Sequence, residues 1–245
     1  MFVLVKLLIK KQTNMSEQAL KDPNQRPDVD PNPDWEAVFD AVKQIGLPLD
    51  PIARAEDIAA MSGVDLAMMN TCLHSVLAPA EDQNPTSYIM PITDPRTGEQ
   101  THQTLDPQDR MPLYNHAASL LHELSKEMSG HEEEFLARAS NVIGLTAVMA
   151  HSFAEGNGRT ARFMSFLVWH AEDQTPEAIE ELKMLGSNRP EEGQRVISFI
   201  PHLDDLSPSA FLDRVACREV PLDDPARYVA ETKRLFDTPF VPLAP

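Results

Sequence analysis

The sequence predicts a mainly α-helical protein with one short β-hairpin. The chain has 245 residues, of which 42% are hydrophobic, so it can bury the core of one domain with extensions or of one and a half domains. In most segments the apolar residues recur three or four positions apart, which is the spacing of one helix face. A convincing strand pattern occurs once, between residues 87 and 105. These observations favour a helical bundle.

The first 34 residues are expected to lie outside the core. Residues 1–11 are apolar, but the run is too short to span a membrane and no signal-peptide cleavage site follows it. We interpret it as a frayed strand or as a translation start placed too early, with Met15 as the real start; a short membrane-surface anchor is the alternative. Residues 16–34 are rich in Asp, Asn, Gln and Pro, which is typical of a solvated linker.

An N-terminal helical extension is expected at residues 35–85. A helix is predicted at 35–45, ended by Gly46. Residues 55–73 resemble a helix-turn-helix, in which the turn glycine lets two helices cross closely. A DNA-reading helix needs basic or amide groups, and this one offers only Asn70 and His74. We therefore favour a helix pair packed on the core; the alternative is a nucleotide-sensing DNA-binding regulator.

The middle of the chain is predicted to contain a hairpin followed by helices. A strand is expected at 87–93, with a turn at 94–98 and a return strand reaching residue 105. An amphipathic helix is expected at 111–128. After a break, the three glutamates at 132–134 are expected to begin an acidic helix, and we assign the neighbouring His131 to a solvated face. Further helices are expected at 176–185, 195–200, 211–218 and 226–236.

Residues 151–162 carry the functional signal. The apolar run 141–150 has helical spacing and delivers His151, a titratable imidazole, at a helix end. Gly156, Asn157 and Gly158 break the helical pattern, which resumes at Arg159. A glycine loop that opens a helix presents backbone N–H groups and a positive dipole end, so its natural occupant is a phosphate group.

Charged side chains extend this anion site. Arg159 and Arg162 are three residues apart, so they share a helix face and can reach one polyphosphate. Glu155 directly before the loop suggests Mg²⁺, which commonly takes one or two carboxylates together with phosphate oxygens. The alternative is that His151 caps a helix while the arginines form surface ion pairs. That alternative gives no reason for a glycine loop between His151 and the arginines.

This stretch resembles the signature of the Fic family, His-x-Phe-x-Asp/Glu-Gly-Asn-Gly-Arg-x-x-Arg. Every specified position is filled, by His151, Phe153, Glu155, Gly156, Asn157, Gly158, Arg159 and Arg162. The resemblance extends over roughly residues 87–200. It implies a Fic-type helical bundle with a β-hairpin flap, and an enzyme that transfers AMP from ATP to a hydroxyl side chain of a target protein.

The resemblance also implies a role for each position. His151 would be the general base, Phe153 would anchor the loop in the core, and Glu155 would hold Mg²⁺, although many members have Asp there. The backbone of residues 156–158 and the Asn157 amide would cradle the α- and β-phosphates. Arg159 and Arg162 would grip the outer phosphates, and the hairpin would pair with the backbone of the target.

The resemblance leaves the donor of the transferred group and the regulation of the enzyme more open. Related proteins transfer UMP, phosphate or phosphocholine, but the phosphotransfer relatives usually replace the second glycine, so Gly158 favours AMP. Many members carry an inhibitory Ser/Thr-x-x-x-Glu-Gly/Asn helix. Residues 188–193, with Glu192, and residues 119–123 match it only in part. We expect no restraint by the usual glutamate; restraint is absent or comes from a separate inhibitory partner.

Composition narrows the partners. The formal net charge of -17 argues against nucleic acid as a bulk electrostatic partner, but it leaves room for a local ATP pocket. Cys72 and Cys217 form no CxxC pair, which predicts neither a zinc site nor a disulfide framework and indicates a reducing compartment. We expect a protein without a membrane span, cytoplasmic or delivered into the cytoplasm of another cell. The predicted segments are 1–34, 35–85, the catalytic core 86–200, and 201–245 with C-terminal helices and tail.

Overall fold

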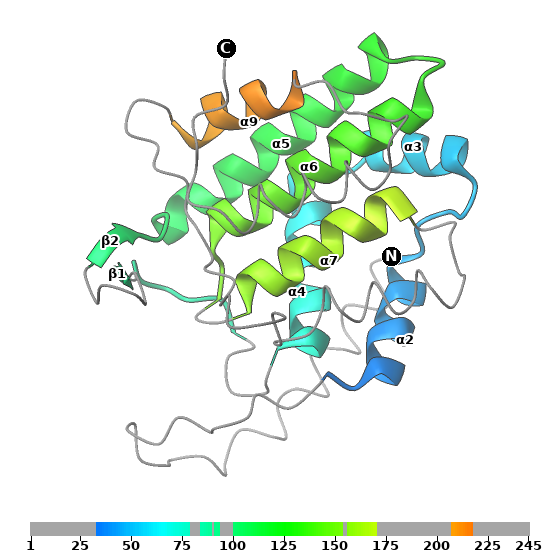
Figure 1. Cartoon of the computed structure of the whole chain (residues 1–245). Coiled ribbons are helices and arrows are strands. Elements are labelled where there is room, and N and C mark those ends of the chain that lie inside the picture. Colours follow the sequence, from blue (N-terminus) through cyan, green and yellow to red (C-terminus); the bar gives the residue numbers. More distant parts are fainter. Residues whose placement is uncertain are drawn as a thin grey trace, which may run out of the picture. The chain divides into compact units, whose positions relative to one another are not determined.

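The computed structural model describes residues 33–78, 84–89, 91–93, 100–153, 156–170 and 207–217. By its contacts the chain divides into Met1–Pro31 and Asn32–Pro245, and every described residue belongs to the second unit. The described part contains seven helices and one two-stranded ribbon (Figure 1). The predicted mainly α fold class is therefore confirmed. Outside the described residues lie the linker up to residue 32, the helices expected at 176–185, 195–200 and 226–236, and Glu192.

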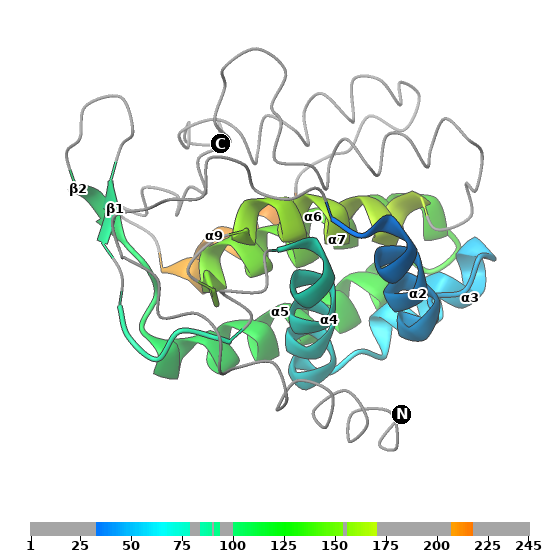
Figure 2. The same cartoon turned by 90° about the horizontal axis from the view of Figure 1, so that it is seen from below.

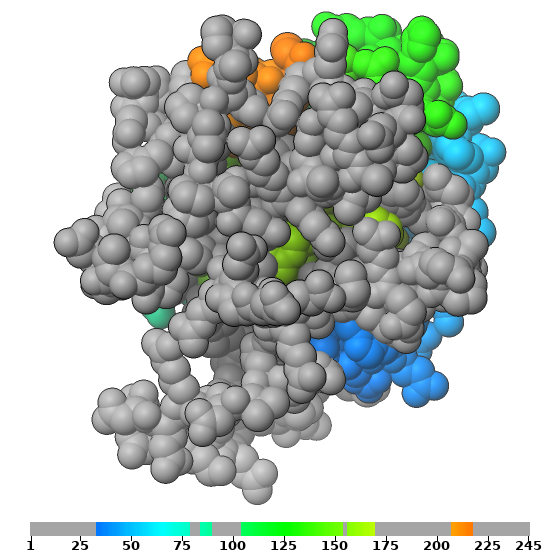
Figure 3. Space-filling model, viewed as in Figure 1, coloured from blue at the N-terminus to red at the C-terminus, as the bar shows by residue number. Residues whose placement is uncertain are grey.

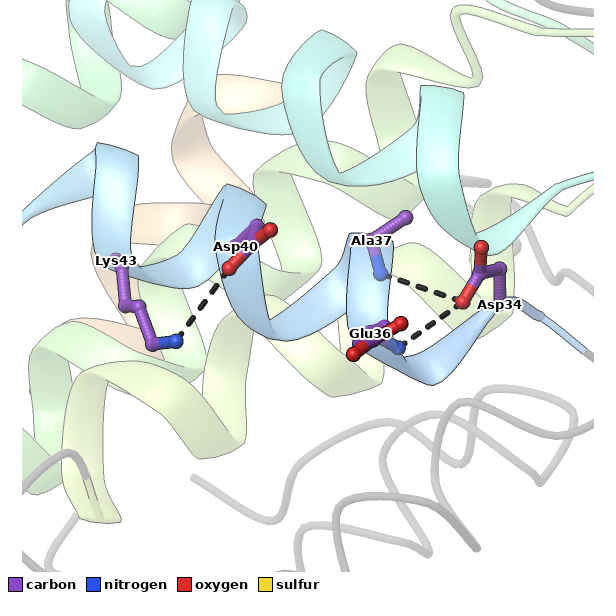
Figure 4. A network of polar contacts seen from close by, with 5 residues as sticks. All are labelled: Asp34, Glu36, Ala37, Asp40 and Lys43. Atoms are coloured by element: carbon purple, nitrogen blue, oxygen red, sulfur yellow. Dashed lines mark hydrogen bonds and ion pairs between the residues drawn. The ribbon is translucent and has the colours of Figure 1, made fainter.

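Helix α2 (Trp35–Ile45) begins and ends where the sequence predicts. The carboxylate of its N-cap, Asp34, accepts hydrogen bonds from two backbone N–H groups of the first turn at 3.1 and 3.4 Å (Figure 4). Gly46 closes the helix at φ 72°, a left-handed conformation that suits glycine. Atoms of this helix are open to view in Figure 3, and its exposed ion pair, Asp40 with Lys43 at 3.4 Å, adds little stability.

The predicted helix pair forms α3 (Pro51–Ala59) and α4 (Gly63–Leu77). Ser62 caps α4 through a capping box. At Gly63 an added Cβ would lie 2.2 Å from Oδ1 and 2.7 Å from the backbone N of Asn115. The glycine therefore allows α4 to approach the helix that carries Asn115, whereas the sequence analysis assigned it to the crossing with α3.

The two α4 side chains that were considered for DNA contacts are both buried. Asn70 is 2% exposed and donates from Nδ2 to the hydroxyl of Tyr114 at 2.7 Å. His74 is fully buried and stacks on Phe153 with 3.6 Å between ring centroids. Because both side chains are buried, neither is available to base edges in this structure.

The core is built around α6 (Glu132–Ala150). Every residue of this helix from 135 onward is buried except Arg138, as in a helix surrounded by others on all sides. It contacts α5 (Pro107–Glu127), α7 (Asn157–His170) and α9 (Pro208–Ala216), and the views of Figures 1 and 2 agree on these neighbours. The acidic helix start predicted at 132–134 is confirmed.

Two of the predicted helix boundaries need correction. Helix α5 begins at Pro107, four residues before the predicted start, because Asp106 provides an N-cap and proline suits the first helical position. Helix α9 was predicted at 211–218 but extends over Pro208–Ala216, because Ser207 provides its N-cap. The carbonyl of its last residue, Ala216, accepts a hydrogen bond from Arg138 at 3.2 Å. This contact fixes the end of α9 on α6.

A two-stranded antiparallel ribbon lies between α4 and α5 in the chain. Strand β1 (Pro91–Thr93) pairs with β2 (Gln100–Gln103), with Ile92 opposite His102 (Figure 2). The prediction of a strand from residue 87 is wrong for residues 87–89, since residues 87 and 88 form a bend and residue 89 belongs to no helix or strand. Whether the ribbon acts as a flap for a target protein stays a prediction.

Candidate functional site

His151 forms the turn that ends α6. Its backbone N–H donates to the carbonyl of Ala147 at 3.2 Å, and its φ of 40° is left-handed. It is the one non-glycine residue with a positive φ among the residues that the structure describes. This conformation costs an ordinary residue about 1 kcal/mol or more and often marks functional positions. The predicted helix end at His151 is confirmed.

Phe153 and Asn157 close the loop that follows. The Phe153 ring is fully buried against the imidazole of His74, with 8° between the ring planes. The Asn157 amide accepts from the N–H of Phe153 at 3.0 Å and donates to its carbonyl at 2.5 Å. The placement of Phe153 agrees with its expected anchoring role. The Asn157 amide, which was expected to contact phosphate, is bonded within the loop instead.

Gly156 provides the sharp turn into α7. Its φ is +78°, and an added Cβ would lie 3.1 Å from Cβ of Ala78 and 3.2 Å from Nε2 of His74. Both its conformation and the close approach of α4 therefore require glycine. Helix α7 begins at Asn157, so Gly158 lies in its first turn and the predicted three-residue glycine loop is shorter than expected.

The start of α7 keeps the features of an anion site. Backbone N–H groups in the first turn of a helix have no partner further back in that helix, and they carry its positive dipole end. Arg159 and Arg162 follow on one face and are 6% and 8% exposed. Arg159 also donates a hydrogen bond to the carbonyl of Leu77, the last residue of α4. This link between the loop and α4 was not foreseen from the sequence.

The imidazole of His151 is buried and neutral at pH 7. Burial, with a smaller contribution from the positive charge of Arg110, lowers the pKa of His151 from 6.5 to about 4. The residue is 7% exposed, and its Nδ1 has no hydrogen-bond partner among the described residues. A neutral imidazole can accept a proton, so the electrostatics are compatible with a general base.

A polar network that the sequence analysis missed surrounds this turn. Arg110 of α5 donates to the carbonyl oxygen and to the hydroxyl of Thr86, at 2.6 and 2.8 Å. The N–H of Thr86 donates to the carbonyl of Ser152 at 2.8 Å. Tyr114 is hydrogen-bonded to the side chains of Ser152 and Asn70, and burial raises the pKa of its hydroxyl.

One signal in the sequence could have found two members of this network. Arg110 lies three residues before Leu113 and seven before Ala117, so it occupies the apolar face of α5, where a charge needs bonded partners. Asn70 occupies the buried face of α4 in the same way, four residues after Leu66. Thr86 and Ser152 take part through their hydroxyls and also through backbone groups, and the backbone groups leave no trace in the pattern of side chains.

Glu155, the predicted Mg²⁺ ligand, lies outside the described residues. Within the described ranges no group of three or more His, Cys, Asp or Glu side chains could hold a metal ion. Magnesium needs only one or two carboxylates when phosphate oxygens complete its shell, so the remaining donors would come from a bound nucleotide. Cys72 and Cys217 are both free thiols, and burial raises the pKa of Cys72.

Comparisons with known proteins add no relative. No family model matches the chain, and neither a curated protein nor a solved structure matches it significantly. Across the described parts of the chain, none of the helices combines the length and the apolar character needed to cross a membrane.

Proposed function

We propose that the protein is a Fic-type adenylyltransferase that transfers AMP from ATP to a serine, threonine or tyrosine hydroxyl of a target protein. One observation carries the proposal. In the described residues of the signature, a buried neutral imidazole lies at the end of α6, and two buried arginines lie near the start of α7. A structural turn would need neither the imidazole nor the arginines.

In this proposal His151 is the general base. The imidazole accepts the proton of the target hydroxyl while that oxygen attacks the α-phosphorus of ATP; the bond to the bridging oxygen breaks and pyrophosphate leaves. Because the pKa of His151 is about 4, the group is unprotonated throughout the neutral range. Such a base is weak, so the barrier must be lowered mainly by positioning and by stabilisation of the phosphate charge.

The phosphates are proposed to bind at the start of α7. The N–H groups of residues 156–158 and the side chains of Arg159 and Arg162 provide donors at one helix end. Glu155 would hold Mg²⁺, which supplies positive charge to the phosphate oxygens when it is bound. The ribbon of β1 and β2 would receive the target as an added strand, with backbone bonds that set its register.

We further propose that the usual inhibitory glutamate does not restrain this enzyme. Ser119 and Glu123, one of the two partial matches to that motif, are exposed on α5. The other, Glu192, lies outside the described residues, and a Glu192→Gly variant with markedly higher activity would contradict this view. Restraint is then absent or comes from a separate partner.

A label-transfer assay tests the activity and its alternatives. Purified protein, Mg²⁺ and a cell lysate are supplied in parallel with ATP labelled at the α-phosphate, ATP labelled at the γ-phosphate, labelled UTP and a labelled phosphocholine donor. We expect protein-bound label from α-labelled ATP only, and none with His151→Ala. Label only from the γ-phosphate, UTP or phosphocholine donor would replace AMP transfer by that reaction. No label from any donor would contradict the proposed transfer.

A further inference from the structure

Arg110 joins the two ends of the segment that contains the β-ribbon. Thr86 precedes β1 and Arg110 follows β2, and the guanidinium bonds both the carbonyl and the hydroxyl of Thr86 across 24 positions of sequence, at 2.6 and 2.8 Å. Strands β1 and β2 therefore start from a base that this contact closes. A two-stranded ribbon has little stability of its own, so its direction depends on how that base is fixed.

The same base is attached to the turn that carries His151. The N–H of Thr86 donates at 2.8 Å to the carbonyl of Ser152, the residue after the imidazole. The Ser152 side chain is hydrogen-bonded to Tyr114, one turn along α5 from Arg110. Thr86 is thus bonded through its N–H to the His151 turn and through its carbonyl to α5.

The burial of Arg110 indicates that this side chain does more than fill space. The residue is only 6% exposed, and the acceptors of its two hydrogen bonds are neutral oxygens of one threonine. Burial lowers the pKa of Arg110, and this effect is larger than that of the Asp106 carboxylate, which also acts on its charge. A charge placed in such surroundings is costly, and an apolar residue would pack there without that cost. The guanidinium therefore contributes something beyond packing, namely a forked contact and a positive charge near His151.

We propose that Arg110 is a positioning residue that fixes the base of the β1–β2 ribbon relative to His151. If a target segment pairs with the ribbon, as the proposed function requires, Arg110 sets how far its hydroxyl lies from the imidazole. Only this consequence rests on the proposed function. We call the contacts among Arg110, Thr86 and Ser152 the clasp; they belong to the fold and do not depend on the proposed function.

The charge environment of His151 gives the clasp a second readout. The buried ionisable side chains of α4, α5 and α7 are His74, Arg110, Tyr114, Arg159 and Arg162. Among the described groups Arg110 is the charged residue that acts on the pKa of His151. Loss of the guanidinium should therefore raise that pKa, whereas an arginine whose charge lies too far from the turn would leave it unchanged.

The test compares Arg110→Met with the wild-type chain by NMR. We expect amide hydrogen exchange at Thr86 to speed up by about tenfold or more, the equivalent of losing bonds to a charged donor, while α6 amides stay protected. We also expect the pKa of His151 to rise in an imidazole titration. Unchanged exchange at Thr86 together with an unchanged His151 pKa would overturn the proposal.

Arg138→Met is the matched control. Arg138 is also partly buried and also donates to a backbone carbonyl, that of Ala216 at 3.2 Å. It lies 13 residues before His151 on α6, about 20 Å away at 1.5 Å per residue. This variant should leave Thr86 exchange and the His151 titration as in the wild type. The same changes in the control would mean general loosening and would overturn the proposal.

A milder variant covers the case in which Arg110→Met does not fold. Thr86→Val removes one of the two acceptors and keeps the backbone bonds, so exchange at residue 86 should rise to a smaller extent; no rise overturns the clasp.

Where label transfer is active, Arg110→Met should raise KM for the target and leave KM for ATP unchanged, and an equal rise in both contradicts the link to the ribbon. Exchange and titration need no ATP, so they judge the clasp even if the proposed activity fails.

Discussion

Acid should destabilise the fold through His151. Between pH 6.5 and about 4 the unfolded chain carries a proton on this imidazole and the folded chain does not. The unfolded state then binds more protons, so the free energy of unfolding falls as pH falls. The contribution is fully present above pH 6.5 and is lost progressively toward pH 4. The whole difference corresponds to about 3 kcal/mol, of which about 2 kcal/mol is lost by pH 5.

Urea denaturation at pH 7.5 and pH 5.0 measures this effect. Carboxylates also titrate on acidification, so the wild type is compared with His151→Asn, which cannot titrate and whose residue type tolerates a positive φ. We expect the wild type to lose about 2 kcal/mol more than the variant between the two pH values. His122→Asn, at an exposed position of α5, serves as the control and should behave as the wild type. Equal losses in the wild type and His151→Asn would refute a buried neutral imidazole.

Two further substitutions test the loop. Gly156→Ala should lower the free energy of unfolding by about 1–3 kcal/mol more than Gly130→Ala does. Both glycines have positive φ, but only Gly156 has atoms at 3.1 and 3.2 Å from the added Cβ. Equal melting temperatures for the two variants would contradict the close approach of α4. Asn157→Ala should lower the free energy of unfolding by about 2 kcal/mol, because it leaves the backbone N–H and carbonyl of Phe153 without their amide partner. Urea denaturation checks this value, and an unchanged midpoint would show that the amide does not hold the loop.

Local patterns predicted much of the helical framework. The apolar spacing and Gly46 placed α2, the three glutamates placed the start of α6, and the apolar run 141–150 placed its end at His151. Helix formation and termination depend on such neighbours in sequence. Helix α5 was predicted to begin four residues too late, because the prediction followed the apolar spacing from residue 111 and did not use Asp106 and Pro107 as a helix start. The first strand was predicted too long, because β-propensity in residues 87–89 does not decide pairing.

The environment of the site could not be predicted in the same way. The signature identified His151, but its low pKa depends on burial and on Arg110, which is 41 positions away in the chain. The contacts of Thr86 with Ser152 and of Arg159 with Leu77 run through backbone carbonyls, which every residue type carries. Such contacts follow from how helices pack, and no pattern of residue types encodes them.

The most direct test of the central claim is to measure AMP transfer and ATP binding with the wild type and His151→Asn side by side. If His151 is the general base and α7 the phosphate site, the wild type transfers α-phosphate label to protein. The variant then transfers none, although it binds ATP with about the same affinity. Equal transfer by both proteins would contradict the role of His151, and absence of ATP binding by the wild type would contradict the phosphate site.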